Sequence, residues 1–465
     1  MANLLEAYKN RLAISESIHQ RSHNGAKMSN QKKLMIASVL NNTSKFLNEA
    51  FSTEAATQKS MIGDWKKFCL NVSTTALPNL ILPELMLVQP MTSLSGYVTY
   101  LRYTAGVNKG GVKQDDLFNS AYRLGQMTED RSNYTANFVV EKADSAEYTP
   151  AWTPVVGSIE VEDSANNWIA AVVNEDGAVT NANGKRIRYT YNNIVIPQAS
   201  TPDSIPTLTA NMAHIQLTAK ARRIAVYYSQ IAAFQAKTDY GYDLGEQLSA
   251  QAQGELAYEI DTEGVFMLRN AAERMADLQF PMYEIALNQG AHGTYISRSQ
   301  YYEGFSEVIA RGKRVIYTRT QKFAPNYMVV GANVLTILPY LKGWTAAPAG
   351  TVNGPYYAGT VDGLKVYVSP SIGENEFFFG VNGSDLQTSA AVYAPYMAIV
   401  PTQLLGFADG GMSQGFSTMY DMKLLSTYNI TSGAEGTADA VREDAEDGTI
   451  GKFSWLLCAG ELTNA

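Results

Sequence analysis

A long run of apolar residues at helical spacing places the strongest constraint on this chain. Residues four positions apart lie on one face of an α-helix, and five apolar residues follow this spacing: Leu244, Leu248, Ala252, Leu256 and Ile260. The pattern predicts a single helix over residues 243–276, roughly 50 Å long at about 1.5 Å per residue. Three glycines within it weaken a helix, so close packing against a neighbour is needed to offset them: Gly245, Gly254 and Gly264.

The composition is that of a globular chain with an acidic surface. Hydrophobic residues make up 46% and charged residues 17% of the 465 residues, and the net charge is −8. This balance argues against tight sequence-independent binding to nucleic acid, because such binding needs many Lys and Arg contacts to phosphate. A length prior of roughly 150 residues per domain suggests about three domains.

The cysteines and the apolar runs indicate where the chain is made. Cys69 and Cys458 imply no disulfide framework and fit a reducing compartment, and we expect both to be buried as small hydrophobic residues. No apolar run reaches signal-peptide length at the N-terminus or the ~20 residues needed to span a bilayer. We therefore expect a protein that is soluble when made. The chain has 28 Tyr, 16 Phe and 16 Met. These residue types are enriched at protein interfaces, so their number suggests large partner surfaces.

Residues 1–49 differ from the rest of the chain in charge. They hold seven Lys or Arg against three Glu, a net charge of +4, which leaves −12 for the remaining residues. Apolar residues recur at helical spacing on both sides of a turn-like break at residues 22–25. The segment is thus expected to form a basic helical hairpin.

The next segments change character several times. Residues 77–91 are apolar but contain three prolines, which predicts an extended, packed arm rather than a helix or a central strand. Residues 104–135 are polar and suit a long exposed loop. Residues 137–207 contain short strand patterns with hairpin signals at Gly177 and Asn183-Gly184, which predicts a β-rich insertion. From residue 278 onward helical and strand patterns alternate.

Several short motifs occur in an order that resembles a known family. They are Ala76-Leu-Pro-Asn-Leu-Ile81 with Val88-Gln-Pro-Met91, Leu217-Thr-Ala-Lys-Ala-Arg-Arg223, the helix from Asp243 to Glu263, Asn326-Tyr-Met-Val-Val-Gly331, Tyr357-Ala-Gly-Thr-Val-Asp-Gly-Leu-Lys-Val-Tyr-Val-Ser-Pro370, Gly380-Val-Asn-Gly-Ser-Asp385, Val392-Tyr-Ala-Pro-Tyr396 and Phe416-Ser-Thr-Met-Tyr-Asp-Met422. Together they span most of residues 76–428 apart from the insertion. The series is similar to the major capsid proteins of T-even-type bacteriophages.

The resemblance implies an α+β chain with the Hong Kong 97 phage capsid fold and a β-rich insertion. The implied parts are a basic prodomain or scaffold-contacting segment (1–49), an N-terminal arm (50–97), an extended loop (98–228) carrying the insertion (about 137–207), a peripheral domain (229–325) with a spine helix (about 243–276), an axial domain (326–428), and an acidic loop with a C-terminal return to the core (429–465).

The resemblance also implies a function and partners. The chain is expected to assemble itself into hexamers, with pentamers as a further form, of an icosahedral or elongated phage head. This shell encloses genomic DNA without binding it specifically. Expected partners during assembly in the bacterial host cytoplasm are a scaffold or core protein, a prohead protease, a portal and decoration proteins. No cofactor, metal or membrane is expected.

The resemblance points to particular site residues. Prohead proteases of this family cut after Glu, with Leu or Ile two residues earlier, and Leu47, Glu49 and Ala50 fit this pattern. Two other Glu fit it as well. We expect inter-subunit contacts at Leu82, Met86, Lys109 and Lys113. Lys109 and Lys113 lie in the predicted loop, where some shells of this fold form cross-links, but a solvated loop tip is the favoured interpretation.

Two alternatives remain open. A vertex-specific paralogue that forms only pentamers would share the same fold. A carbohydrate-binding surface protein would use the insertion, where aromatic residues could stack on sugars: Trp152, Trp168, Tyr189 and Tyr191. An enzyme is not expected, because the sequence has no phosphate-binding loop, no nucleophile elbow and no His or Cys at metal-ligand spacing.

Overall fold

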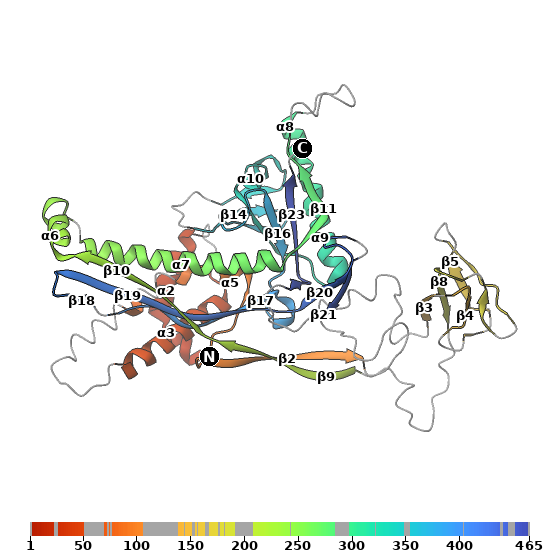
Figure 1. The fold of residues 1–465 in the computed structure, drawn as a ribbon, viewed down its shortest axis with the longest axis horizontal. Coiled ribbons are helices and arrows are strands. Elements are labelled where there is room, and N and C mark those ends of the chain that lie inside the picture. Colours follow the sequence, from red (N-terminus) through yellow and green to blue (C-terminus); the bar gives the residue numbers. More distant parts are fainter. Residues whose placement is uncertain are drawn as a thin grey trace.

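A computed structural model gives the arrangement of most of the chain (Figure 1). The residues that it describes are 2–22, 27–50, 69–71, 74, 77–105, 138–143, 145–150, 154–155, 157–162, 167–174, 177–180, 182–190, 208–241, 243–283, 297–320, 322–347, 354–402, 404–437, 440–444 and 452–463. Two large sheets and one long helix make up its centre, and a small β-rich unit stands apart from them.

The basic N-terminal segment is helical, as predicted. It forms α1 (Ala2–Ala7), α2 (Lys9–Ser22) and α3 (Asn30–Ala50). One face of α3 carries Met35, Ile36, Val39 and Leu40, which are fully buried in the main core. The segment is therefore packed into the body of the subunit, although its charge distinguishes it from the rest.

The proline-rich arm (residues 77–91) is packed but not extended. It forms a 3-10 turn η1 (Leu77–Asn79), one helical turn α5 (Leu82–Leu85) and a short strand β1 (Leu87–Val88). Pro83 stands in the first turn of α5, where its missing N–H is not needed. The prediction of an extended arm was wrong because proline is compatible with the start of a helix as well as with extended chain.

One sheet lies between the long helix and α3. Its strands are β1, β17 (Ala391–Pro401), β19 (Gly411–Leu424) and β10 (Lys220–Ser229), with β18 (Leu405–Gly406) added to β19. The helix α7 (Leu244–Ala271) covers one face, where its Leu256 packs with Phe416 of β19. On the other face Leu47 of α3 packs with Met397 and Val400 of β17. This sheet is called the peripheral sheet below.

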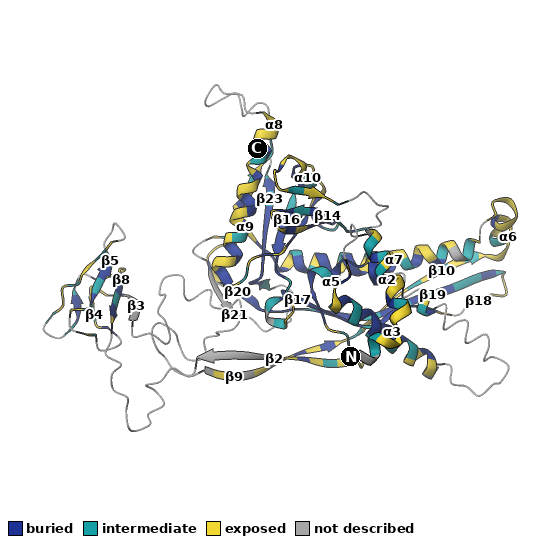
Figure 2. Ribbon diagram, turned by 180° about the vertical axis from the view of Figure 1, so that it is seen from behind, coloured by how far each residue is buried: buried dark blue, intermediate teal, exposed yellow. Residues whose placement is uncertain are grey.

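The second, axial sheet has seven strands in the order β11 (Glu273–Pro281), β23 (Leu457–Thr463), β16 (Glu376–Gly380), β12 (Tyr327–Val330), β15 (Leu364–Val368), β14 (Tyr356–Val361) and β13 (Trp344–Ala346). The central strand β12 is buried at every residue. Helix α9 (Phe305–Thr320) lies so close to this sheet that a Cβ at Gly312 would come within 2.4 Å of the Phe379 ring. Figure 2 shows the buried residues concentrated in this sheet and beneath α7.

Shorter elements complete the body. They are α6 (Gln230–Asp239), α8 (Arg298–Glu303), α10 (Ala332–Leu335), η4 (Leu338–Tyr340), η5 (Leu386–Thr388), β20 (Thr427–Ser432), β21 (Val441–Asp444) and β22 (Phe453–Ser454). The last three strands form a small antiparallel sheet next to the axial one.

The insertion has its own core. Its strands are β3 (Phe138–Lys142), β4 (Glu147–Tyr148), β5 (Glu160–Glu162), β6 (Trp168–Ala170), β7 (Val179–Thr180) and β8 (Arg186–Thr190). Val161, Val179, Ile187 and Tyr189 are buried together there, with no residue of the body among the described members of this cluster. Gly177 and Gly184 adopt positive φ at the predicted turns, so the β-rich insertion is confirmed.

The predicted boundaries need correction at two places. The long helix ends at Ala271 instead of residue 276, because Glu273 already pairs as the first residue of β11. The predicted axial domain, 326–428, also divides differently: β17 and β19 belong to the peripheral sheet, whereas β11 and β23, predicted elsewhere, complete the axial sheet. The mixture of helices and sheets agrees with the α+β class that the resemblance implies, whereas nearly all of the predicted long loop (104–135) lies outside the described residues.

Candidate functional site

A long two-stranded hairpin projects from the body (Figure 1). It consists of β2 (Ser95–Ala105) and β9 (Leu208–Thr218), paired from Ser95↔Thr218 to Ala105↔Leu208. Near its base Val98, Ile215 and Leu217 are buried against the peripheral sheet. On the opposite face Tyr97 is 70% and Met212 64% exposed. The hairpin therefore shows apolar side chains that its own subunit does not cover.

A second exposed apolar surface lies at the far end of the peripheral sheet, called the tip below. Helix α6 and strand β18 meet there, at the end away from the hairpin in Figure 1. Large exposed side chains gather on these elements and the adjoining strand ends: Tyr227, Ile231, Phe234, Tyr240, Leu404, Leu405 and Phe407. Soluble monomers rarely keep so many large apolar side chains together in water, and such patches usually mark interaction sites.

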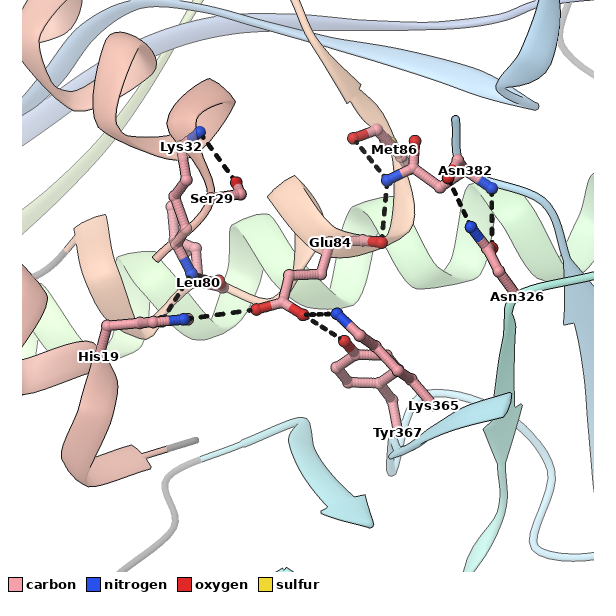
Figure 3. Close-up of polar contacts among 10 residues, drawn as sticks. All are labelled: His19, Ser29, Lys32, Leu80, Glu84, Met86, Asn326, Lys365, Tyr367 and Asn382. Carbon is pink, nitrogen blue, oxygen red and sulfur yellow. Dashed lines mark hydrogen bonds and ion pairs between the residues drawn. The ribbon is translucent and has the colours of Figure 1, made fainter. Parts of the chain in front are cut away.

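A charge cluster, buried except at Lys365, joins the N-terminal helices to both large parts of the body (Figure 3). Glu84 of α5 is at its centre. His19 Nε2 of α2 lies 3.8 Å from one oxygen of Glu84, and Lys365 Nζ of β15 lies 3.2 Å from the other. The Tyr367 hydroxyl donates to that second oxygen. Lys32 of α3 lies 3.4 Å from His19 Nδ1.

Lys32 and Asp261 bind the same peptide group from opposite sides. Lys32 Nζ donates to the carbonyl oxygen of Leu80 at 3.0 Å, and the carboxylate of Asp261 on α7 accepts from the N–H of Ile81 at 3.1 Å. Burial lowers the pKa of Lys32 to about 8, opposed by the charges of Glu84 and Asp261. Burial likewise raises the pKa of Asp261 to about 7, against the stabilising N–H donors of Ile81 and Leu82 and the charge of Lys32. Desolvation is thus the largest influence on both groups.

The predicted inter-subunit contacts fall into two groups. Leu82 and Met86 are both fully buried within the subunit, where α3 and α7 of the same chain cover the arm. Their assignment as inter-subunit contacts stays a prediction. Lys109 and Lys113 lie outside the described residues.

The predicted processing site lies at the end of α3. Leu47 is buried beside Cys69, and Glu49 and Ala50 belong to the last turn of the helix. Exposed loops are the usual places of proteolytic cleavage, whereas this position is helical.

The two candidate sugar-stacking residues that the structure describes in the insertion, Trp168 and Tyr189, do not form an exposed row. Tyr189 is fully buried. The ring of Trp168 is half-covered by its own neighbours, with the guanidinium of Arg188 4.4 Å and that of Arg186 5.8 Å from its centre. These arginines pair with Glu160 and Glu162 on the next strand. Trp152 and Tyr191 lie outside the described residues.

Among the described residues no group of three or more His, Cys, Asp or Glu is arranged to hold a metal ion. No helix within the described ranges is long and apolar enough to cross a membrane.

Comparison with known proteins identifies the class. The family model described as major capsid protein Gp23 matches residues 62–447, which is most of the chain. The chain is therefore a structural protein of a virion, built into a shell from many copies. In particular, it belongs to the Gp23 family of major capsid proteins. No curated protein matches the sequence significantly.

Solved phage proteins resemble the chain more distantly. A chain of Microbacterium phage Oxtober96 is 11% identical, with 75% of this chain and 85% of that chain covered and a TM-score of 0.36. A chain of Mycobacterium phage Che8 is 13% identical, with 58% of this chain and 78% of that chain covered and a TM-score of 0.34. The capsid of Myoviridae phage XM1 is 9% identical, with 57% of this chain and 81% of that chain covered and a TM-score of 0.33. The family match, and not these likenesses, carries the assignment.

Sequence reasoning missed the charge cluster. Lys32 stands beside Lys33 and Asp261 beside Thr262, and nothing in these surroundings separates a buried charge from a solvated one. Only the position of Asp261, next to Ile260 on the apolar face of the long helix, could have drawn attention to it.

Proposed function

We propose that the subunit assembles into hexamers of the shell, with pentamers as a further form, by placing exposed apolar surfaces of neighbouring copies against one another. One observation carries this proposal: the hairpin and the tip both expose large apolar side chains, and the two elements extend from opposite sides of the body in Figure 1. A two-stranded hairpin is only marginally stable alone in water. Contact with another copy removes its Tyr97 and Met212 from water and fixes its position.

The separation of the two surfaces suits a closed ring. A contact between two different patches is heterologous, and repetition of such a contact produces a ring when the rotation closes. Contacts between identical patches would instead produce a two-fold pair. We therefore propose hairpin-to-tip contacts around each ring, with many moderate interfaces stabilising the shell together.

Substitutions on the two surfaces test this arrangement. Tyr97→Ser on the hairpin and Phe234→Ser on the tip should each reduce the yield of closed shells at least tenfold, measured by sedimentation and electron microscopy. Because both side chains are exposed, the subunit itself should lose less than about 0.5 kcal/mol of stability.

Val172→Ser is the matched control, since Val172 is 71% exposed but belongs to the insertion. It should leave shell yield unchanged. Wild-type yields from the hairpin and tip variants would contradict the proposal.

We propose further that residues 1–49 contact a scaffold or core protein and that a prohead protease removes them by cutting after Glu49. The supporting observation is the +4 charge of this segment against −12 for the remainder. A basic segment suits an acidic scaffold, and its removal leaves a surface that attracts DNA less. We propose no catalytic role for the chain. Portal and decoration proteins, assembly in the host cytoplasm and enclosure of DNA without specific contacts belong to the same proposal.

Mass spectrometry of mature particles tests the cut. A dominant chain that begins at Ala50 supports it, and Glu49→Ala should retain the segment. Glu16→Ala, at another Glu that fits the protease pattern, should change nothing at Ala50. Mature particles that keep residues 1–49 would rule the cut out.

A further inference from the structure

The arm is a middle layer between two helices. Towards α7, a Cβ at Gly264 would come within 2.2 Å of the Leu82 side chain, so the arm and the spine helix are in close contact. Towards α3, the arm residues share the main core with the buried face of that helix. The arm contains only single turns and one short strand, so it makes few hydrogen bonds of its own. Its position depends on the two helices that enclose it and, at β1, on pairing with β17.

Helix α3 holds the arm near both ends. Lys32, in its first turn, donates to the carbonyl of Leu80 at 3.0 Å. Asn42, ten residues later, donates to the carbonyl of Met91 at 2.7 Å and to that of Tyr396 at 3.0 Å. Two of these bonds reach carbonyl groups of the arm and the third reaches β17, and removal of α3 leaves all three carbonyl groups without these donors.

We infer that α3 is a latch that holds the arm on the spine helix, with Lys32 binding the Leu80–Ile81 peptide against Asp261. While α3 is in place, the peptide is bound on its carbonyl side by a cation and on its N–H side by an anion. When α3 leaves, Asp261 loses a buried positive charge and the apolar side of the arm meets water. Both changes favour movement of the arm away from α7.

The inference gives the N-terminal segment a second role beyond the scaffold contact proposed above. This role in the shell rests on the proposed function. If residues 1–49 are cut off, the part of the arm that precedes β1 loses one of its two enclosing helices and can rearrange, while β1 stays paired with β17. The latch itself is a property of the uncut chain. It can therefore be tested without any protease, and its failure is separate from failure of the proposed cleavage.

The two cysteines provide a built-in measurement. Cys69 is fully buried in a cluster with Leu47 of α3, whereas Cys458 is fully buried in β23 of the axial sheet. Burial raises the pKa of both thiols to about 12, so both should react slowly with a maleimide. Opening of α3 exposes Cys69 alone, and the ratio of the two labelling rates in the full-length chain reports the latch.

Lys32→Met is the test variant. It keeps the length of the side chain but removes the donor to Leu80 and the charge beside Asp261. We expect the labelling rate of Cys69 to rise at least tenfold relative to Cys458. Hydrogen exchange at the Ile81 and Leu82 amides should accelerate at least tenfold as well, because the arm loosens.

Lys33→Met is the matched control. Lys33→Met removes the same charge from the same helix, but Lys33 is only partly buried and pairs with Glu16, 2.9 Å away, outside the charge cluster. Its labelling ratio should stay within twofold of wild type. Glu84→Gln is the second test variant in case Lys32→Met does not fold, and it should also raise the Cys69 ratio.

Three results would overturn the latch. One is equal behaviour of the Lys32 and Lys33 variants. Another is a parallel rise of Cys69 and Cys458, which would mean that the cluster stabilises the whole fold. The third is exposure of Cys69 while the Ile81 and Leu82 amides stay protected, since the arm would then not depend on α3.

Discussion

Asp261 and Gly264 lie one turn apart on α7 and fix the arm by different means. Asp261 accepts hydrogen bonds from the arm backbone, and Gly264 provides the space that Leu82 occupies. A charge and a missing side chain thus act on the same neighbouring segment. The role of each residue can be tested by a single substitution.

Removal of the Asp261 charge should change how stability depends on pH. Burial raises the pKa of this carboxyl from 3.8 to about 7. Because the folded chain holds the proton more tightly than the unfolded one, the stability contributed by Asp261 is complete below about pH 4 and is lost as pH rises through 7. Asp261→Asn keeps an acceptor for the Ile81 N–H but cannot titrate.

Urea unfolding of the full chain at pH 5, 6 and 7 measures this effect. The free energy of unfolding of the Asn variant, relative to that of wild type, should increase from pH 5 to 6 and again from pH 6 to 7. A constant difference between the two proteins over this range would show that Asp261 is already ionised at pH 5.

Two glycines of α7 should respond to the same substitution with opposite signs. Gly264→Ala places a Cβ 2.2 Å from Leu82 and should cost roughly 1–3 kcal/mol by overpacking. Gly254 has no atom within 4 Å of such a Cβ, so Gly254→Ala should gain about 0.5–1 kcal/mol from helix propensity. Thermal unfolding of the two variants checks both values. A stabilised Gly264→Ala chain would mean that the arm does not lie on α7.

Among the elements, local patterns were easier to predict than pairings. The four-residue spacing from Leu244 to Ile260 identified α7, and the glycine turns identified the insertion, because both signals lie within short stretches of chain. The partners of β11 and β17 could not be predicted, because strand pairing joins segments far apart in sequence. The charge cluster remained hidden for the same reason: its members come from α2, α3, α5, α7 and β15.

The insertion should be separable from the body. Ala105 and Leu208 are register partners at the end of the hairpin, so a two-residue Asn-Gly turn can replace residues 106–207. Because the described core of the insertion includes no residue of the body, the free energy of unfolding of the body should change by less than about 1 kcal/mol.

Denaturant unfolding of the shortened chain measures that change. Leu217→Ala is the comparison, since Leu217 is buried at the hairpin base and its truncation should cost about 2–5 kcal/mol. A loss of that size in the shortened chain would show that the body depends on the insertion.

At the scale of the whole molecule, distant segments complete one another. Strand β23 lies between β11 and β16 in the axial sheet. Glu273 at the start of β11 is fully buried, pairs with Arg319 of α9 and accepts from the Tyr428 hydroxyl and the Gly436 N–H. The axial part is therefore a single unit. Its segments come from before and after β17 and β19 in the sequence.

Deletion of β23 should abolish this unit. A chain that stops before Leu457 leaves β11 without its partner and uncovers β16, so we expect loss of cooperative unfolding and a fall of at least tenfold in soluble protein. A chain that stops after Thr463 keeps every residue of β23 and should behave as wild type. Circular dichroism and the soluble fraction distinguish the two. Cooperative melting of the first chain would contradict the role given to β23.

The pairing of Glu273 with Cys458 in neighbouring strands has a consequence for synthesis. A ribosome adds about 5–20 residues per second, so roughly 10–40 s pass between the emergence of β11 and that of its partner. Throughout this interval the edge of β11 has no strand to pair with. Many ribosomes make the same protein during infection, and each nascent chain offers its unpaired edge to the others. The time until β23 emerges is therefore the period in which edge-to-edge pairing between nascent chains is most favoured.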